Sequence, residues 1–213
     1  FLISDFFSSK IISKFSAEKA KIITSFSMFY DIEDPICFAK DIDASLAEDG
    51  LWIFEQSYLP QMLKTNAFDT ICHEHLEFYS LKQIDWILSK ANLKVIDVEF
   101  NDINGGSFSV TAAKINSHYQ PKTKHLERIR NDELVYGLDS LEVFNNFKLN
   151  VDKNCSLLMK FLNEAKLKNK SVYGLGASTK GNVLLQYCGI DNTLIKAIGD
   201  VNEDKYATYT PGT

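Results

Sequence analysis

Length, composition and charge are those of an ordinary globular protein. The chain has 213 residues, 45% hydrophobic and 24% charged, enough to bury a core in one large domain or in one and a half smaller ones. The formal net charge is -5 and no Lys/Arg cluster occurs, which argues against a nucleic-acid surface. No apolar run reaches the roughly eighteen residues of a membrane span.

Cysteine spacing and the first residues indicate the compartment. The chain begins at Phe1, and the FLISDFFSS segment lacks the basic head and long apolar run of a signal peptide. Cys37, Cys72, Cys155 and Cys188 form no CxxC pair, so neither a disulfide framework nor a zinc ribbon is indicated. We expect a cytoplasmic protein with reduced thiols.

The first part of the chain has a strand–helix–strand pattern. KIITSFS (21–27) fits a buried parallel strand, and LWIFEQ (51–56) a second one. Between them, residues 35–50 have helical periodicity, with Pro35 suited to the first turn and Gly50 to the position just past the end. This order predicts a parallel crossover unit.

A further helix and two strands follow. LKQIDWILSKAN (81–92) has one apolar face, which predicts an amphipathic helix. The alternating segments 94–100 and 106–114, separated by the turn sequence NDING, predict an antiparallel hairpin. The apolar face of the helix consists of Leu81, Ile84, Ile87 and Leu88.

The predicted secondary structure of the rest of the chain changes twice. From about Gln120 to Lys168 it is polar and helical, with apolar positions recurring at Leu134, Leu138, Leu141, Phe144 and Phe147. A strand, a glycine loop and a helix then follow in SVYGLGASTKGNVLLQYCG, with another strand in LIKAIGDVN. We predict three parts: an α/β domain over 1–117, a helical connector over 118–168, and the start of a second α/β domain over 169–213.

Ionisable side chains gather in the segment from Asp69 to Tyr79, which we call the HEH loop. His73 or His75 is a candidate general base, because imidazole titrates near neutrality, and Glu74 is a candidate to position it or a substrate hydroxyl. A purely structural role, with one histidine capping a helix and the other packed, explains the pair equally well. No HExxH spacing or third ligand occurs, so we predict no metal.

Two glycine-containing segments are candidate ligand loops. Asn104-Gly105-Gly106-Ser107 is explained by a tight hairpin turn, although missing side chains would also let a ligand approach the backbone. Gly174-Leu175-Gly176-Ala177-Ser178-Thr179-Lys180-Gly181 follows a strand and opens a helix, which directs N–H groups and a helix dipole at one spot suited to a phosphate.

Several segments together, in this order, resemble the sugar C-methyltransferase family: ITSFSMFYDIEDP, DGLWIFEQSYLP, FDTICHEHLEFYSLKQI, NGGSFSV and YGLGASTKGN. Members have a small zinc-binding N-terminal domain, a middle S-adenosylmethionine (SAM)-binding domain and a C-terminal Rossmann-like domain that helps to hold a deoxythymidine-diphosphate (dTDP) sugar. The resemblance implies an α/β fold: the second half of a Rossmann-like SAM methyltransferase domain ending in an antiparallel hairpin, a helical connector, and the start of a Rossmann-like nucleotide-sugar-binding domain.

The resemblance also implies roles for individual residues. His75 matches the general base that removes a proton beside a ketone, Glu74 a sugar contact, and Cys72 a position where some members carry tyrosine. The segment Ser25, Ser27 and Met28 is implied to lie beside SAM. The remaining implied substrate-binding residues are His73, Asn104, Gly105, Gly106, Ser107, Gly174, Gly176, Ala177, Ser178, Lys180 and Asn182.

The implied activity is SAM-dependent C-methylation beside the ketone of a dTDP-linked keto-deoxysugar. By the same resemblance the zinc domain and the first part of the SAM domain are expected before Phe1, with no zinc site in this chain, and we expect the chain alone to be inactive. Three other readings remain: an O- or N-methyltransferase, a non-catalytic nucleotide-sugar-binding module, and a dinucleotide oxidoreductase in which Asp200 binds a ribose.

Overall fold

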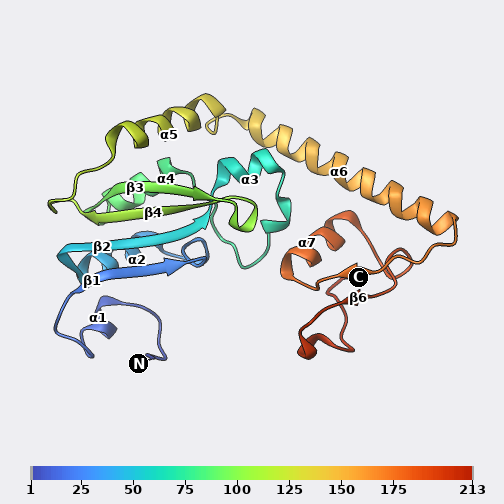
Figure 1. The fold of residues 1–213 in the computed structure, drawn as a ribbon, viewed down its shortest axis with the longest axis horizontal. Helices are drawn as coiled ribbons and strands as arrows, with labels where there is room; N and C mark the ends of the chain where they lie inside the picture. Colours follow the sequence, from blue (N-terminus) through green and yellow to red (C-terminus); the bar gives the residue numbers. More distant parts are fainter. Residues whose placement is uncertain (1, 213) are drawn as a thin grey trace. The chain divides into compact units, whose positions relative to one another are not determined.

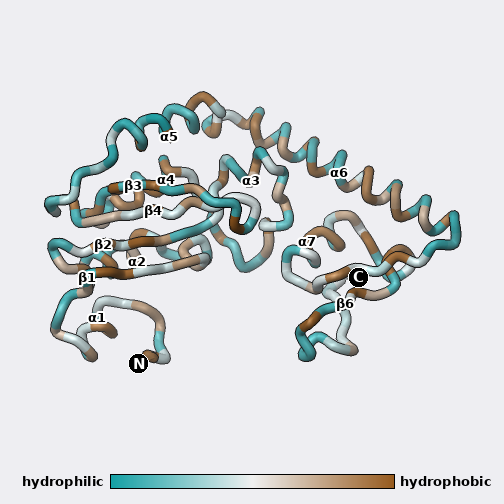
Figure 2. Tube along the Cα trace, viewed as in Figure 1, coloured by the Kyte–Doolittle hydropathy of each residue, from teal (hydrophilic) through white to brown (hydrophobic). Residues whose placement is uncertain are grey.

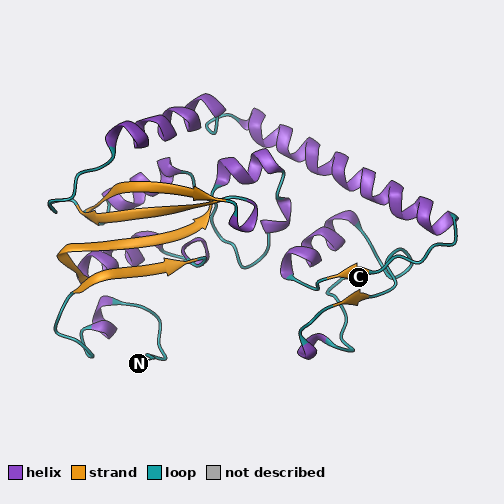
Figure 3. Cartoon of the chain, in the orientation of Figure 1, coloured by secondary structure: helices purple, strands orange, loops and turns teal. Residues whose placement is uncertain are grey.

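The computed structural model describes residues 2–212, which form two compact units (Figure 1). Unit 1 comprises the chain through Thr65 together with Leu76–Ser140, and unit 2 comprises Asn66–His75 together with the chain from Leu141 onward. Unit 1 holds a four-stranded sheet and unit 2 a two-stranded one (Figure 3). The mixed α/β class predicted from the sequence is confirmed.

The sheet of unit 1 has the strand order β1-β2-β4-β3. β1 (Ala20–Phe26) pairs parallel to β2 (Leu46–Ser57), and the helix α2 (Pro35–Ser45) connects them. β3 (Leu93–Asn101) and β4 (Ser107–Lys114) form the predicted antiparallel hairpin, and β4 also pairs antiparallel to β2. Both the crossover unit and the hairpin are therefore confirmed.

Two details of this sheet differ from the prediction. β1 has no buried residue and Ile22 is 63% exposed, because within the described residues β1 is an edge strand that pairs only with β2. Gly50 does not follow a helix end. It lies inside β2, where a Cβ atom would come within 2.8 Å of the Ala20 carbonyl oxygen, so close strand packing explains the glycine.

The helices of unit 1 cover an aromatic core. α4 (Leu81–Ser89) buries the four apolar positions that the sequence predicted for it. Phe29 lies in the short helix η1 (Phe29–Asp31) and contacts the rings of Trp52 and Phe54, both at 5.4 Å between centroids. The remaining helices of the unit are α1 (Ser9–Ile12), α3 (Leu59–Thr65), η3 (Ile103–Gly105) and α5 (Thr123–Tyr136).

A buried carboxylate attaches α5 to the start of α4. Glu133 of α5 is only 5% exposed, and its Oε1 accepts hydrogen bonds from the Tyr58 hydroxyl at 2.8 Å and from the Leu81 N–H at 2.6 Å. Its Oε2 accepts from the Lys82 N–H at 3.1 Å. These are the first N–H groups of α4, which lack partners inside their own helix, so Glu133 caps that helix from another segment of the chain.

Unit 2 contains a strand–loop–helix–strand arrangement. β5 (Gly174–Leu175) precedes α7 (Thr179–Cys188) and pairs parallel to β6 (Ile198–Gly199), which confirms the predicted order of elements. Its other helices are η2 (Phe68–Thr70), α6 (Leu141–Leu167) and η4 (Glu203–Lys205). The small core of the unit consists of Leu162, Leu185, Cys188 and Ile190.

The predicted connector is helical but not continuous. Gly137, at φ 84° in the left-handed region, ends α5, and α6 begins at Leu141. α5 belongs to unit 1 and α6 to unit 2. Figure 2 shows that α5 is mostly hydrophilic. Of the recurring apolar positions, Leu134 and Leu141 are exposed, whereas α5 buries Leu126, Ile129 and Glu133. The three predicted domain ranges stay a prediction.

Two further observations concern the whole described chain. All four cysteines are free thiols. Among residues 2–212, no helix is both long enough and apolar enough to cross a lipid bilayer.

Candidate functional site

The HEH loop is held by backbone hydrogen bonds on both sides of its histidines. The His75 N–H donates to the Cys72 carbonyl at 3.2 Å and closes a turn that presents His73 and Glu74. Directly after the turn, within unit 1, the N–H groups of Leu76 and Glu77 both donate to the Tyr30 carbonyl, at 3.0 and 3.1 Å. Hydrogen bonds therefore fix the backbone of the loop before and after His75.

The two histidines differ in environment. The side chains of His73 and Glu74 are 84% and 57% exposed, and His73 Nε2 lies 4.0 Å from Glu74 Oε1, so any ion pair between them is weak. His75 is half-buried. Neither histidine caps α4, because Glu133 accepts from the N–H groups of Leu81 and Lys82 and Ser80 forms a capping box with Gln83. The capping role considered for one histidine is thus excluded at this helix.

The short helix η2, which leads into the HEH loop, packs within unit 2. η2 lies against α7, and the ring of buried Phe68 contacts the ring of Tyr187 at 5.4 Å between centroids. The Tyr187 hydroxyl donates to Asp152 of α6 at 2.7 Å, which fixes the ring. The glycine loop and the start of the HEH loop thus attach to the two ends of one short helix.

The Asn104–Ser107 segment is a tight turn, as its composition predicted. Asn104, Gly105 and Gly106 have φ values of 56°, 85° and 122°. A Cβ atom at Gly106 would lie 2.1 Å from Gln61 Cγ, so only glycine fits there. The Ser107 hydroxyl donates to the Ile103 carbonyl at 2.9 Å. These contacts account for the residue types by local structure, and the sugar-binding role stays a prediction.

The predicted cofactor segment follows β1. Ser25 Oγ accepts from Trp52 Nε1 at 3.0 Å, whereas Ser27 is exposed, with φ 52°. Met28 is partly buried against the core. The chain therefore turns sharply at Ser27, at the carboxyl end of a parallel strand, where α/β proteins bind their ligands.

Three of the predicted segments meet at the carboxyl end of β2, all within unit 1. Backbone hydrogen bonds join this strand end to the cofactor segment, to the glycine turn and to the end of the HEH loop. They run from the Ser27 N–H to the Glu55 carbonyl at 2.8 Å, from the Tyr58 N–H to the Gly106 carbonyl at 3.1 Å, and from the Leu59 N–H to the Tyr79 carbonyl at 2.9 Å.

Two buried polar side chains near this strand end were missed by sequence reasoning as site candidates. Both amide atoms of Gln56 and the hydroxyl of Tyr79 are buried and make no hydrogen bond within the described residues. Burial raises the pKa of the Tyr79 phenol well above its usual range, with a smaller contribution from the charge of Glu77. No sequence signal finds such groups, because hydrogen-bond partners follow from tertiary structure.

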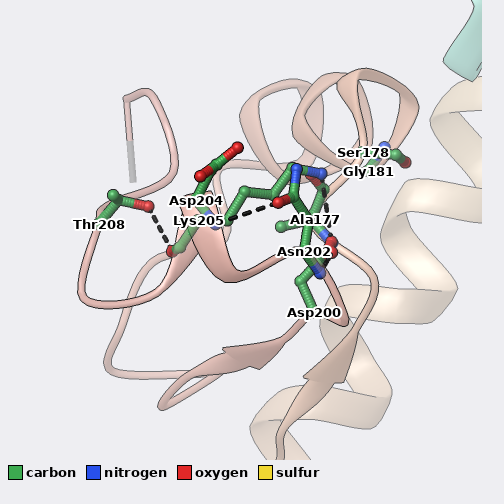
Figure 4. Close-up of polar contacts among 8 residues, drawn as sticks. All are labelled: Ala177, Ser178, Gly181, Asp200, Asn202, Asp204, Lys205 and Thr208. Atoms are coloured by element: carbon green, nitrogen blue, oxygen red, sulfur yellow. Dashed lines mark hydrogen bonds and ion pairs between the residues drawn. The ribbon is translucent and has the colours of Figure 1, made fainter.

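In unit 2, several backbone N–H and C=O groups of the glycine loop form hydrogen bonds with other residues of the same unit (Figure 4). The Gly176 N–H donates to the Gly199 carbonyl and the Ala177 N–H to Asp200 Oδ2, both at 2.7 Å. Lys205 Nζ donates to the Ala177 carbonyl at 2.8 Å. Asp200 is therefore the anion that the Ala177 N–H holds, and the dinucleotide reading, in which Asp200 binds a ribose, loses its support.

Hydrogen bonds to backbone N–H groups, first that of Asn202 and then that of Ala177, lower the pKa of Asp200 to about 2. At the start of α7, Ser178 Oγ accepts from the Gly181 N–H at 3.1 Å as an N-cap. The N–H groups of Gly176, Ala177 and Gly181 thus all donate to acceptors within unit 2, and the phosphate-binding role of the loop stays a prediction. Lys180 lies in the first turn of α7.

A cavity of about 900 Å³ adjoins this loop inside unit 2. Asn182 of α7 lines it, and the Oδ1 atom of Asn182 is buried without a hydrogen-bond partner in the described residues. Tyr206, Tyr209 and Lys196 also line the cavity. Of the predicted unit 2 residues, Ala177 and Asn182 therefore border a space of ligand size. Among residues 2–212, no three His, Cys, Asp or Glu side chains are grouped to hold a metal ion.

Comparison with known families assigns the class. The family model described as a methyltransferase domain matches residues 5–98, which contain β1, α2, β2, α4 and most of β3. The model described as the C-methyltransferase C-terminal domain matches residues 102–213, more than half of the chain. The chain belongs to the C-methyltransferase family.

A curated relative agrees with this assignment. C-methyltransferase NovU from Streptomyces niveus is 29% identical over 194 residues, which cover 91% of this chain and 46% of NovU. The chain thus spans about half the length of this relative.

Solved structures are more distant. Magnesium protoporphyrin IX methyltransferase from Synechocystis PCC 6803, with bound SAH, has 8% identity and a TM-score of 0.37, covering 46% of this chain and 47% of that chain. A structure of LepI in complex with SAM has 10% identity and a TM-score of 0.39, covering 46% and 27%. These scores are too low for an argument about function.

Proposed function

We propose that the protein is a SAM-dependent C-methyltransferase that acts on the carbon beside the ketone of a dTDP-linked keto-deoxysugar. The observation that carries this proposal is the family membership of the chain, combined with an HEH loop whose His73 and Glu74 side chains are exposed and whose backbone is fixed by hydrogen bonds. The similarity to NovU, a C-methyltransferase, supports transfer to carbon rather than to oxygen or nitrogen.

In this proposal His75 is the general base. Carbon acids beside a ketone are weak, so their deprotonation needs a base that is uncharged near neutral pH, and imidazole is the side chain best suited to that. The turn between Cys72 and His75 and the hydrogen bonds of Leu76 and Glu77 fix the backbone on both sides of this imidazole. Exposed Glu74 is then free to bind a sugar hydroxyl.

SAM, when bound, supplies an electrophilic methyl group on a sulfonium. Of the predicted residues, Ser27 fits a ligand edge best, because it is exposed beyond the end of β1 and follows exposed Phe26. Ser25 is engaged by Trp52 and supports the strand end instead. The task of the chain is to hold the sugar carbon in line with that methyl group.

In this proposal the nucleotide part of the dTDP sugar binds to unit 2. Asn182 and its cavity offer an unpaired carbonyl oxygen, two tyrosine side chains for stacking on a base, and Lys196 for a phosphate charge. The internally bonded Asp200 keeps the glycine loop in shape. Four free thiols fit the reducing cytoplasm, where we place the reaction.

The test is hydrogen exchange into a dTDP-4-keto-deoxysugar by the complete protein in deuterated water without SAM. We expect deuterium at the carbon beside the ketone with the wild type and a loss of about a hundredfold or more with His75→Ala. His118→Ala is the matched control, because His118 is an exposed histidine outside all predicted site segments, and we expect it to exchange as the wild type does.

Equal exchange by wild type and His75→Ala would reject His75 as the base. Absence of exchange in the wild type, together with methylation of an oxygen or a nitrogen when SAM is added, would reject C-methylation.

A further inference from the structure

Two cysteines meet between α6 and α7 inside unit 2. Cys188 of α7 belongs to the buried apolar cluster of the unit, and Cys155 of α6 packs against that cluster while half-buried. The Cα atoms of the two helices approach within 8 Å of each other. A disulfide spans Cα atoms about 4.4–6.8 Å apart, so helices this close lie near the range that one such bond bridges.

The contacts on either side of the two cysteines fix α7 against α6. Asp152 lies one turn before Cys155, and its carboxylate accepts the hydroxyl of Tyr187, the residue before Cys188, at 2.7 Å. Two turns after Cys155, Leu162 lies on the same face of α6 and is part of the buried cluster. The two thiols are therefore held between a side-chain hydrogen bond and apolar packing.

The two thiols differ in environment and hence in reactivity. Burial raises the pKa of the Cys188 thiol to about 12, and a hydrogen bond with the Cys155 thiol adds to this shift. Cys155 is the more accessible of the two. The thiolate is the reactive form of a cysteine, and access limits its reaction with an oxidant in solution. Cys155 is thus the thiol that an oxidant meets first, and Cys188 lies beside it.

We propose that Cys155 and Cys188 form a reversible disulfide when the protein meets a small-molecule disulfide such as oxidised glutathione. The Cys155 thiolate attacks one sulfur of the oxidant and displaces one glutathione thiolate. The Cys188 thiolate then attacks the Cys155 sulfur of this mixed disulfide and displaces the second glutathione thiolate. The two cysteines lose two electrons and two protons, which leave as two glutathione thiols.

This disulfide joins the last turn of α7 to α6 covalently. The neighbouring Tyr187 ring contacts Phe68 of η2 at 5.4 Å between centroids, so the same bond also restrains the segment that leads into the HEH loop. A crosslink removes open conformations in which such contacts are broken. Oxidation therefore rigidifies unit 2. Neither cysteine carries a role in methyl transfer or nucleotide binding, so the inference stands apart from the proposed function.

The test titrates the complete protein with oxidised glutathione at a fixed concentration of reduced glutathione. The remaining thiols are then blocked, and tryptic peptides are mapped by mass spectrometry. Residues 154–160 carry Cys155 and residues 181–196 carry Cys188, and we expect these two peptides to be joined. Because ring closure is intramolecular, the crosslink should appear at an oxidant concentration about tenfold or more below that which attaches glutathione to exposed Cys37. A reducing agent should release it.

Three variants separate this site from a general effect of the oxidant. Amide hydrogen exchange at the end of α7 and in residues 66–75 should slow by about tenfold when the wild type is oxidised. Cys37→Ala is the matched control and should respond as the wild type does. Cys155→Ala and Cys188→Ala, which keep a small apolar side chain at each position, should show no such slowing.

Four results would overturn the inference. In the first, Cys155 and Cys188 stay reduced or carry separate glutathione adducts while Cys37 is modified. In the second, the crosslink forms only after the protein has been unfolded in urea. In the third, a reducing agent fails to release it. In the fourth, the crosslink forms but exchange in α7 and in residues 66–75 does not change, which would exclude a rigidifying switch.

Discussion

Replacing Glu133 with alanine tests the view that a single carboxylate holds α5 on unit 1. The substitution removes the acceptor for the Tyr58 hydroxyl and for the N–H groups of Leu81 and Lys82. The first two of these hydrogen bonds are buried, so their donors stay unpaired, at about 1–3 kcal/mol each. The Lys82 N–H is part-buried and can reach water. We therefore expect a loss of about 3–5 kcal/mol in the free energy of unfolding.

The assay is urea unfolding followed by tryptophan fluorescence, since both tryptophans of this chain, Trp52 and Trp86, lie in unit 1. Glu127→Ala, on an exposed position of the same helix, is the control and should change the free energy by less than about 0.5 kcal/mol. Tyr58→Phe should cost about 1 kcal/mol in the wild type and much less in the Glu133→Ala background. A loss below about 1 kcal/mol for Glu133→Ala would refute the reasoning.

Three further predictions concern single contacts. Tyr79→Phe removes a buried hydroxyl without a partner, so we expect an unchanged or higher urea midpoint; a clear decrease would reveal a missing partner. Tyr187→Leu should increase amide hydrogen exchange in residues 66–75 while Tyr187→Phe, which keeps the ring against Phe68, should not; equal protection in both would contradict the contact. The pKa of Asp200 is lowered to about 2, so its contribution to stability is present above the unfolded value near 4 and is lost as the pH falls through about 2. Acid unfolding of unit 2 should therefore depend less on pH in Asp200→Asn than in the wild type. An unchanged profile would argue against the role of this carboxylate.

The spacing of apolar residues predicted the helices and strands that bury one face of a regular repeat. The period-3.6 apolar face of α4 and the alternation in β3 and β4 appear in the structure because both helices and strands bury one side of a regular repeat. The prediction for Gly50 was wrong because it relied on local pattern alone. A glycine after a helical pattern usually ends the helix, but here the requirement comes from β1, which is remote in the sequence.

The parts of the site that depend on distant contacts could not be predicted. The acceptor of the Leu81 N–H is 52 residues away, and the partner of the Ala177 N–H is 23 residues away. One alternative reading of the sequence assigned Asp200 to a ribose, because the sequence does not show that the Ala177 and Asn202 N–H groups already bind this carboxylate. Sequence reasoning passed over Gln56 because strand periodicity shows which side chains are buried but not whether their hydrogen bonds are made.

The identity of the methyl acceptor tests the central claim most directly. The complete protein is incubated with SAM labelled with ¹³C in its methyl group and with a dTDP-4-keto-deoxysugar, and the product is examined by carbon–proton correlation NMR. The account predicts that the labelled methyl is bonded to the sugar carbon beside the ketone and shows coupling to that carbon skeleton. A labelled methyl bonded to oxygen or nitrogen, or no transfer to any nucleotide-linked keto sugar, would contradict it.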